Sequence, residues 1–290
     1  MSRPASEPSQ PNQFGTPAGA KLSIVIPAYR QGVGIRRDIE QVAAVLETIT
    51  LDYELIVVVD GSPDDTLVHA RAVGSDRIRI FGYDLNRGKG YAVRFGFQQA
   101  SGQVIGFIDA GGDIDPSGLT TAMRILSETD SDLVVGSKRH PNSRVVYPRL
   151  RRLYSFIYQK LVKALFGFDL TDTQTGLKVF RRAAIIRAIP HMSIDRYAFD
   201  VELLAIIRRL GFRKFAESPV DVNLVFPSSI GGIGTILRML IDTFATAMRV
   251  YRVREVFGVT PNAPEDQDTR NLHLVQGARV RPHSIDRSPN

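Results

Sequence analysis

The sequence of 290 residues contains no cysteine and no tryptophan. Without cysteine, the chain has neither disulfides nor thiolate metal ligands. No window of 18 or more uncharged apolar residues occurs, so we expect no membrane-spanning segment. Residues 1–20 are rich in Pro, Ser and Gln and lack the apolar core of a signal peptide. We expect this stretch and residues 257–290 to be disordered tails.

Acidic residues are absent from Leu133 to Phe168, although the whole protein has a net charge of only +7. Eight basic side chains lie in this stretch: Lys138, Arg139, Arg144, Arg149, Arg151, Arg152, Lys160 and Lys163. The basic charge is therefore local, which favours an anionic partner such as a nucleotide or phospholipid headgroups. The aromatic and basic pattern of a nucleic-acid reader is missing, so we expect no nucleic-acid partner.

Apolar, β-branched runs alternate with segments of helical periodicity over the first half of the chain. The expected strands are Leu22–Ile26, Tyr53–Val59, Arg77–Phe81, Val104–Ile108 and Asp132–Gly136. The expected helices are Ile35–Thr48, a helix through Ala72, Tyr91–Ala100 and Ser117–Ser127. This order predicts an α/β fold with a doubly wound, mostly parallel sheet and helices on both faces. Functional groups of such sheets gather at the carboxyl ends of the strands.

Carboxylates follow two of these strands. Asp60 ends the second strand, where it either accepts hydrogen bonds from a nucleotide base or caps the turn that follows. Asp109 ends the fourth strand, and Asp113 and Asp115 come next, after two glycines. Asp109 with Asp113 or Asp115 would hold Mg²⁺ or Mn²⁺ against a diphosphate. Asp115 has the alternative role of capping the next helix.

Two further loops point to nucleotide chemistry. The first strand ends in Pro27, and Tyr29 just beyond it provides an aromatic ring for packing near a base. The segment 86–90, NRGKG, places two cations and two glycines at the start of a helix. Free backbone N–H groups, the helix dipole and the Lys89 charge together favour phosphate there.

Leu150–Leu165 and Ile233–Val253 each have an apolar stripe at helical spacing beside basic side chains. Such a stripe either packs into the core or binds at a membrane interface. The residues alone leave both alternatives open.

In order, the segments SIVIPAYR, ELIVVVDGSPDDT, NRGKGYAVRFGFQQASGQVIGFIDAGGDIDP and VVGSKR resemble family 2 glycosyltransferases of the GT-A fold. Two later blocks are RRLYSFIYQKLVKALFGFDLTDTQTGLKVFRR and YAFDVELLAIIRRLGFRKFAESPVDV. They resemble the branch that glycosylates a polyprenyl phosphate, which includes dolichyl-phosphate β-glucosyltransferases and dolichol-phosphate mannose synthases. The resemblance covers about Lys21 to Val225. It implies a glycosyltransferase domain over residues 21–228 and an amphipathic interfacial helix over 229–256.

The resemblance also assigns roles to individual residues. It implies a nucleotide-sugar site made of Pro27, Tyr29, Asp60, Lys89, Asp109, Asp200 and Glu202. It places the acceptor phosphate near Lys138, Arg139 and Arg152. Catalytic roles fall to Asp109, Arg152, Asp172 and Lys178, and the DTQTGLK segment, which includes Gln174, resembles the acceptor-side loop.

Two positions depart from the family pattern. Gly111 stands where the DxD metal motif has its second acid, so the metal needs Asp113 or Asp109 alone, or is lost. Arg30-Gln31 replaces the Asn-Glu that often follows the tyrosine in relatives. The first hypothesis is transfer of a hexose, with inversion, from UDP-glucose or GDP-mannose to a polyprenyl phosphate. The resemblance also implies a peripheral location on the cytoplasmic face of a membrane.

Two alternatives stay open at this point. One keeps the fold and the donor but transfers to a soluble sugar or small-molecule acceptor. The other is a non-catalytic module that binds nucleotide-sugars.

Overall fold

The computed structural model describes residues 21–50, 52–61, 63–145, 149–223 and 233–252. The predicted tails lie outside these ranges. For residues 149–155, 233, 235, 236, 251 and 252 the structure describes the backbone but not the side chains. The first half contains β1 (Leu22–Ala28), α1 (Gly34–Ile49), β2 (Tyr53–Asp60), α2 (Thr66–Arg71), β3 (Ile78–Tyr83), α3 (Lys89–Gln99), β4 (Val104–Ile108), α4 (Gly118–Glu128) and β5 (Leu133–Ser137). The second half contains β6 (Arg144–Val145), α5 (Arg149–Phe166), β7 (Leu177–Arg181), α6 (Arg182–Ala188), a 3₁₀ turn (Ile189–His191), α7 (Phe199–Arg209), β8 (Phe215–Pro219), β9 (Asp221–Val222) and α8 (Ile233–Arg252).

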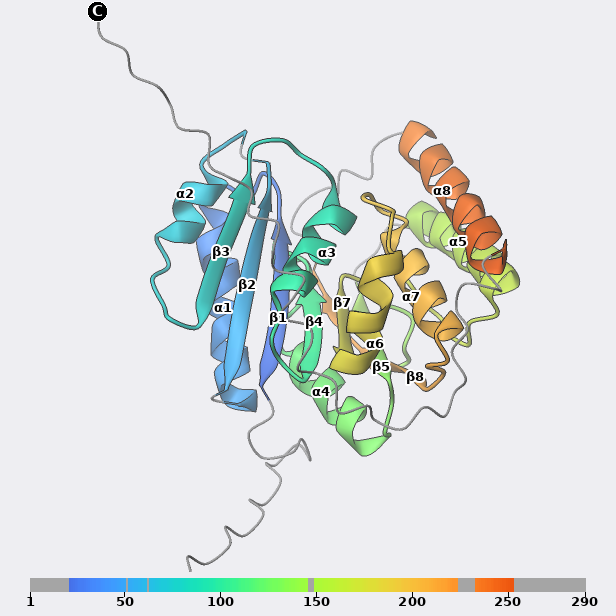
Figure 1. The fold of residues 1–290 in the computed structure, drawn as a ribbon, viewed down its shortest axis with the longest axis horizontal. Helices are drawn as coiled ribbons and strands as arrows, with labels where there is room; N and C mark the ends of the chain where they lie inside the picture. Colours follow the sequence, from blue (N-terminus) through green and yellow to red (C-terminus); the bar gives the residue numbers. More distant parts are fainter. Residues whose placement is uncertain (1–20, 51, 62, 146–148, 224–232, 253–290) are drawn as a thin grey trace, which may run out of the picture. The chain divides into compact units, whose positions relative to one another are not determined.

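Seven strands form one sheet in the order β3-β2-β1-β4-β7-β5-β8 (Figure 1). All neighbours are parallel except β7, which runs antiparallel to both β4 and β5. The predicted mostly parallel sheet is therefore confirmed, and the antiparallel β7 was not predicted. Strand order reverses between β1 and β4, because β2 and β3 lie on one side of β1 and β4 on the other. Ligands of open α/β sheets bind at such a switch point.

Helices cover both faces of the sheet, as predicted. On one face, α1 buries Ile35, Ile39, Val42 and Leu46 against the strands. Their spacing of four, three and four residues is that of a helix with one apolar side. The helices α2 and α4 belong to the same cluster of buried side chains. Every residue of β1 and β2 is buried, which explains their continuous apolar sequence.

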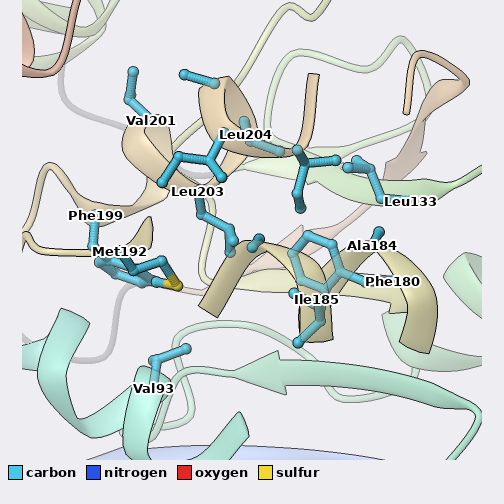
Figure 2. Packing of buried hydrophobic residues seen from close by; sticks show 14 of the residues in the cluster. Val93, Leu133, Phe180, Ala184, Ile185, Met192, Phe199, Val201, Leu203 and Leu204 are labelled. Atoms are coloured by element: carbon cyan, nitrogen blue, oxygen red, sulfur yellow. The ribbon is translucent and has the colours of Figure 1, made fainter. Parts of the chain in front are cut away.

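The other face is covered by α3 and by helices from the second half of the chain. Figure 2 shows part of this core, where Phe180 of β7 lies beside Ile185 of α6. Phe199 at the start of α7 and Met192 belong to the same cluster. The second half of the chain thus supplies most of the helices on this face of the sheet.

The two predicted amphipathic helices are α5 and α8, which contact each other and lie side by side in Figure 1. Each buries part of its surface, for example Val162 of α5 and Ala247 of α8. Each also leaves large apolar side chains exposed. Within the described residues, none of the helices is both long and apolar enough to cross a bilayer.

Candidate active site

Three of the predicted site residues follow neighbouring strands, on both sides of the switch point: Tyr29 after β1, Asp60 at the end of β2 and Asp109 after β4. Tyr29 is 38% exposed, and the guanidinium of Arg30 lies 5.2 Å from the centroid of its ring. The sequence predicted that Pro27 ends β1, and this prediction was wrong. Pro27 is buried within the strand and pairs in register with Val58.

Asp60 is 3% exposed and organises the loop before α3. One carboxylate oxygen accepts hydrogen bonds from the Tyr83 hydroxyl at 2.9 Å and the Arg87 N–H at 2.7 Å. The other accepts from the Asn86 side-chain amide and the Gly88 N–H, both at 2.8 Å. With four donors bound, this carboxylate caps a loop, although the capped loop is 86–88 and not the turn directly after Asp60. Its predicted contact with a nucleotide base stays a prediction.

The start of α3 differs from the predicted phosphate cradle. The N–H groups of Arg87 and Gly88 are bound to Asp60, and the N–H of Tyr91 donates to the Asp195 carbonyl. A Cβ on Gly88 would lie 2.4 Å from that same carbonyl oxygen. The expectation of free backbone N–H groups was wrong at these three positions, because the protein itself supplies the acceptors.

Lys89 is the group in this loop that faces the predicted metal site. Its ammonium lies 2.7 Å from one Asp109 oxygen and donates a hydrogen bond of 2.8 Å to the other. Both side chains are partly exposed, Lys89 by 21% and Asp109 by 31%. Burial alone lowers the pKa of Lys89, but the carboxylates of Asp109 and Asp200 outweigh it and raise the pKa above its ordinary value. Lys89 is therefore a full cation placed on Asp109.

Gly176 fixes the position of Asp109 from the other side. Its carbonyl accepts the Asp109 N–H at 2.8 Å. A Cβ at this position would lie 1.9 Å from an oxygen of Asp109, so only glycine leaves room for the carboxylate. Sequence reasoning missed this residue, although it lies within the DTQTGLK segment that carries the resemblance.

A resident metal centre would need several converging ligands. Among the described residues, no group of three His, Cys, Asp or Glu side chains is arranged to hold a metal ion. A cation such as Mg²⁺ is commonly held by one or two carboxylates together with substrate phosphates. Asp109 at the strand end fits that shared kind of site, in which a diphosphate completes the coordination.

The two acids after Asp109 have separate roles in the structure. The Asp113 carbonyl accepts the Asn223 N–H at 2.9 Å, and its part in metal binding stays a prediction. Asp115 accepts the Ser117 N–H at 2.8 Å, just before α4. The N-cap of α4 is Ser117 itself, so Asp115 closes the turn before the helix and does not cap the helix as expected.

Behind Lys89 lies a fully buried ion pair. The Lys178 ammonium, 0% exposed, donates to the Asp200 carboxylate at 2.5 Å and to the Thr175 carbonyl at 2.7 Å. Burial lowers the pKa of Lys178 and raises that of Asp200, each against the attraction of the other. This differs from the expected direct contact with substrate, because both groups are enclosed by protein.

Asp172 and Lys138 form the next pair. The Asp172 carboxylate is 3.6 Å from the Lys138 ammonium and accepts from the Lys138 N–H, the Thr175 hydroxyl and the Gln174 N–H. Burial raises the pKa of Asp172, but Lys138 and these donors outweigh it and lower the pKa. Arg139 lies 5.5 Å from the Phe156 ring. Arg152 is in α5, and its side chain lies outside the described part of the chain.

Six side chains thus form a row of alternating charge that runs from Asp109 after β4 to Lys138 after β5. Lys89 interacts electrostatically with Asp200, and Lys178 with Asp172. We call this set the charge row: Asp109, Lys89, Asp200, Lys178, Asp172 and Lys138.

Glu202 also serves the protein interior. It is 0% exposed and accepts from the N–H groups of Ser193 and Ile194 at 2.9 and 2.8 Å. Arg249 of α8 donates to Glu202 and to the Ser193 hydroxyl. Glu202 therefore anchors the segment that packs on Gly88 and ties α8 to it, which differs from the predicted place beside the donor sugar.

Comparison with curated proteins gives relatives at about 30% identity. The dolichyl-phosphate beta-glucosyltransferase of Drosophila melanogaster is 32% identical over 206 residues, which are 66% of this chain and 63% of that protein. The Saccharomyces cerevisiae protein of the same name is 31% identical over 259 residues, 80% and 76% of the two chains. Glycosyltransferase AglD of Haloferax volcanii is 31% identical over 71% of this chain, but the match spans only 34% of its length.

Among solved structures, glucosyl-3-phosphoglycerate synthase from Mycobacterium tuberculosis superposes with a TM-score of 0.63. The match is 21% identical and covers 86% of each chain, which shows a shared GT-A-like fold. That structure holds Mn²⁺, UDP and glucosyl-3-phosphoglycerate. The model of glycosyl transferase family 2 matches residues 23–188, more than half of the sequence. This chain belongs to glycosyl transferase family 2.

Proposed function

We propose that this enzyme transfers a hexose from a nucleoside diphosphate sugar to a polyprenyl phosphate at a membrane surface, with inversion at the anomeric carbon. UDP-glucose is the first donor to test, because several relatives at about 30% identity are named beta-glucosyltransferases. GDP-mannose is the second. The observation that carries the lipid acceptor is an exposed apolar face beside the acceptor-side loop.

The apolar face, as we call it, is formed by α8 and α5. On α8, the exposed side chains repeat at intervals of four, three and four residues: Leu237, Ile241, Phe244 and Met248, each 48–59% exposed. On α5 they are Phe156 and Ile157, 47% and 57% exposed. Soluble proteins rarely leave such clusters open to water. Exposed Lys160 and Lys163 add the positive charge that anionic lipids attract.

Direct contacts connect the two helices that carry the apolar face to each other and to the acceptor-side loop. The Gln174 side-chain amide contacts the Met239 sulfur of α8 at 3.5 Å. The Tyr158 hydroxyl of α5 is hydrogen-bonded to Thr243 of α8 at 2.7 Å. Gln174 belongs to the loop that holds Asp172, the partner of Lys138. A lipid phosphate at the bilayer surface would thus meet the basic end of the charge row.

The chemistry follows from the acceptor. A phosphate monoester has a second pKa of about 6, so the attacking oxygen is already anionic and needs no base. This oxygen attacks the anomeric carbon, the bond from that carbon to the diphosphate breaks, and the electron pair leaves with the diphosphate. The protein has to neutralise two anions. Lys138 would serve the acceptor phosphate and Lys89 the leaving diphosphate.

A divalent cation, when bound, would neutralise the leaving diphosphate as a Lewis acid. Asp109 would hold it together with the diphosphate oxygens. The enzyme would then work as a peripheral protein on the cytoplasmic face of a membrane, where nucleotide-sugars are available as donors.

A panel of radiolabelled donors with polyprenyl phosphate tests the reaction. We expect UDP-glucose with Mg²⁺ or Mn²⁺ to give a labelled product that is extracted into organic solvent. Label transferred only to water-soluble sugars would refute the lipid acceptor and favour the soluble alternative. Absence of transfer from every donor would refute the proposed reaction as a whole.

Membrane contact is tested separately by flotation with anionic vesicles. A double variant, Ile241→Glu with Phe244→Glu, places two charges on the apolar face and is expected to abolish flotation. Val68→Glu on α2 is a matched control, because Val68 is 65% exposed but lies on a different helix. Equal flotation of the double variant and the wild type would contradict the proposal.

A further inference from the structure

Asp38 is a buried acid outside the charge row. It lies on α1, within a helix face that is otherwise apolar, and is only 5% exposed. One of its oxygens, Oδ2, accepts the Gly111 N–H at 2.7 Å. Gly111 is the position at which the family pattern has its second metal-binding acid. A carboxylate thus reaches this loop from α1, where the loop itself has none.

The second oxygen of Asp38 is less satisfied. Within the described residues, Oδ1 is buried and accepts no hydrogen bond, and the nearest cation is the Arg37 guanidinium at 3.8 Å. A Cβ placed on Gly112 would lie 3.6 Å from Oδ1 and 3.1 Å from Arg37. A buried carboxylate in this state is costly, so its presence on the apolar side of a helix calls for a reason.

The loop that Asp38 holds has an unusual backbone conformation at two glycines. Gly111 and Gly112 have φ values of 103° and 70°, both in the left-handed region that favours glycine. Two successive glycines of this kind leave a loop free to adopt other conformations. The bond from Asp38 is the side-chain contact that fixes Gly111, directly after Asp109 and Ala110. Asp109 is thereby clamped between two anchors, Gly176 at its own N–H and Asp38 two residues later.

We propose that Asp38 is a positioning residue for the binding of a divalent cation with a nucleoside diphosphate. By holding the Gly111 N–H, it fixes the Asp109 carboxylate in the orientation that the shared cation requires. The acid missing at position 111 is therefore replaced by an acid that acts through the backbone. This inference rests on the proposed function, since it concerns the same donor site.

The test is the gain in nucleotide affinity that Mn²⁺ provides. UDP, and in parallel GDP, is titrated into each protein by calorimetry, once in EDTA and once with Mn²⁺, and the ratio of the two Kd values is the metal gain. Loss of a residue that orients a metal ligand commonly costs 10- to 100-fold in metal affinity. We expect Asp38→Ala to lower the metal gain about tenfold and to leave the Kd in EDTA unchanged.

Asp38→Asn separates positioning from charge. Its amide oxygen can accept the Gly111 N–H, so its metal gain is expected within about threefold of the wild type. A metal gain for Asp38→Ala equal to that of the wild type would overturn the inference, as would an Asp38→Asn variant as impaired as Asp38→Ala. If Asp38→Ala does not fold, Asp38→Glu replaces it, because the longer side chain moves the acceptor away from Gly111.

Glu54→Gln is the matched control. Glu54 is also a buried carboxylate that accepts a backbone N–H, from Ser101, but it lies at the other end of the strands. Its metal gain is expected to equal that of the wild type. If the wild type bound neither nucleotide in the presence of Mn²⁺, the proposed function would fail together with the inference. If the wild type showed a metal gain and Asp38→Ala showed the same gain, the inference alone would fail and the proposed function would stand.

Discussion

Lys89 occupies the position at Asp109 where a metal ion would bind, and this predicts the affinity of the nucleotide-free enzyme for a divalent cation. Its ammonium is within 2.8 Å of both carboxylate oxygens, the place where a divalent cation would bind. A metal ion alone must displace this ammonium and leave it beside Asp200. A metal that arrives with a diphosphate offers Lys89 a new anionic partner. We therefore predict that the wild type binds Mn²⁺ weakly without nucleotide.

The size of the effect follows from the pair itself. A hydrogen bond between charged groups contributes about 1.5–3 kcal/mol net. At about 1.4 kcal/mol for each tenfold change, removing the ammonium raises the affinity for Mn²⁺ alone by roughly 10- to 100-fold. The variant Lys89→Met should show this gain. Without the ammonium, its affinity for UDP in the presence of Mn²⁺ should fall about tenfold.

Mn²⁺ binding is measured by electron paramagnetic resonance or calorimetry, with nucleotide absent and then present. Lys89→Arg keeps a cation at this place and should bind Mn²⁺ like the wild type. Lys138→Met is a matched control, because Lys138 is also a partly exposed ammonium paired with an acid, 23% exposed and 3.6 Å from Asp172. Equal Mn²⁺ affinity of Lys89→Met and the wild type would refute the reasoning.

Three further predictions concern the buried groups. Gly176→Ala places a Cβ 1.9 Å from an Asp109 oxygen, so we expect kcat/KM to fall at least about 100-fold; near wild-type activity would contradict this crowding. Lys178→Met leaves buried Asp200 without its hydrogen-bonded cation and should lower the free energy of unfolding by about 3–5 kcal/mol in urea titrations, with a loss below about 1 kcal/mol as the contrary result. Burial raises the pKa of Glu54, but hydrogen bonds from two serines and an arginine outweigh it and lower the pKa from 4.5 to about 2. The ionised Glu54 carboxylate therefore adds about 3 kcal/mol to the free energy of unfolding above pH 4.5, and this contribution disappears as the pH falls towards 2. The stability difference between wild type and Glu54→Gln should shrink over that range, and a difference independent of pH would contradict the assignment.

The parallel strands could be predicted from the sequence because both of their faces are buried. Val104–Ile108 was predicted with the bounds that the structure has, and Tyr53–Asp60 extends the prediction by one residue. In both strands every side chain packs under helices, so the sequence is a continuous apolar run. Such runs stand out without knowledge of the strand's neighbours.

The strand β7 could not be predicted in the same way. Its sequence, LKVFR, is short and has Lys178 near its centre, which is untypical of a buried strand. The lysine is tolerated because its ammonium donates a hydrogen bond within the core to Asp200, 22 residues later in the chain. A contact between distant elements, and not a local pattern, makes this segment a strand.

The same distinction separates the site residues that were predicted from those that were missed. Asp109 was found because an acid directly after a buried strand lies at a known ligand-binding edge. Gly176 and Asp38 act on the Asp109 loop from a different strand connection and a different helix. Their roles depend on tertiary contacts, for which a single sequence carries no signal.

The charge row explains why so many ionisable groups are acceptable in one interior. It contains three carboxylates and three ammonium groups, alternating in sign, so its formal charge is zero. Neutralising a single member leaves an uncompensated charge in a region of low dielectric constant. A diphosphate that draws Lys89 towards itself has the same effect on Asp200, whose remaining partner is Lys178. We therefore expect donor binding at one end of the charge row to change the electrostatic potential at the other, where Lys138 is proposed to meet the acceptor phosphate.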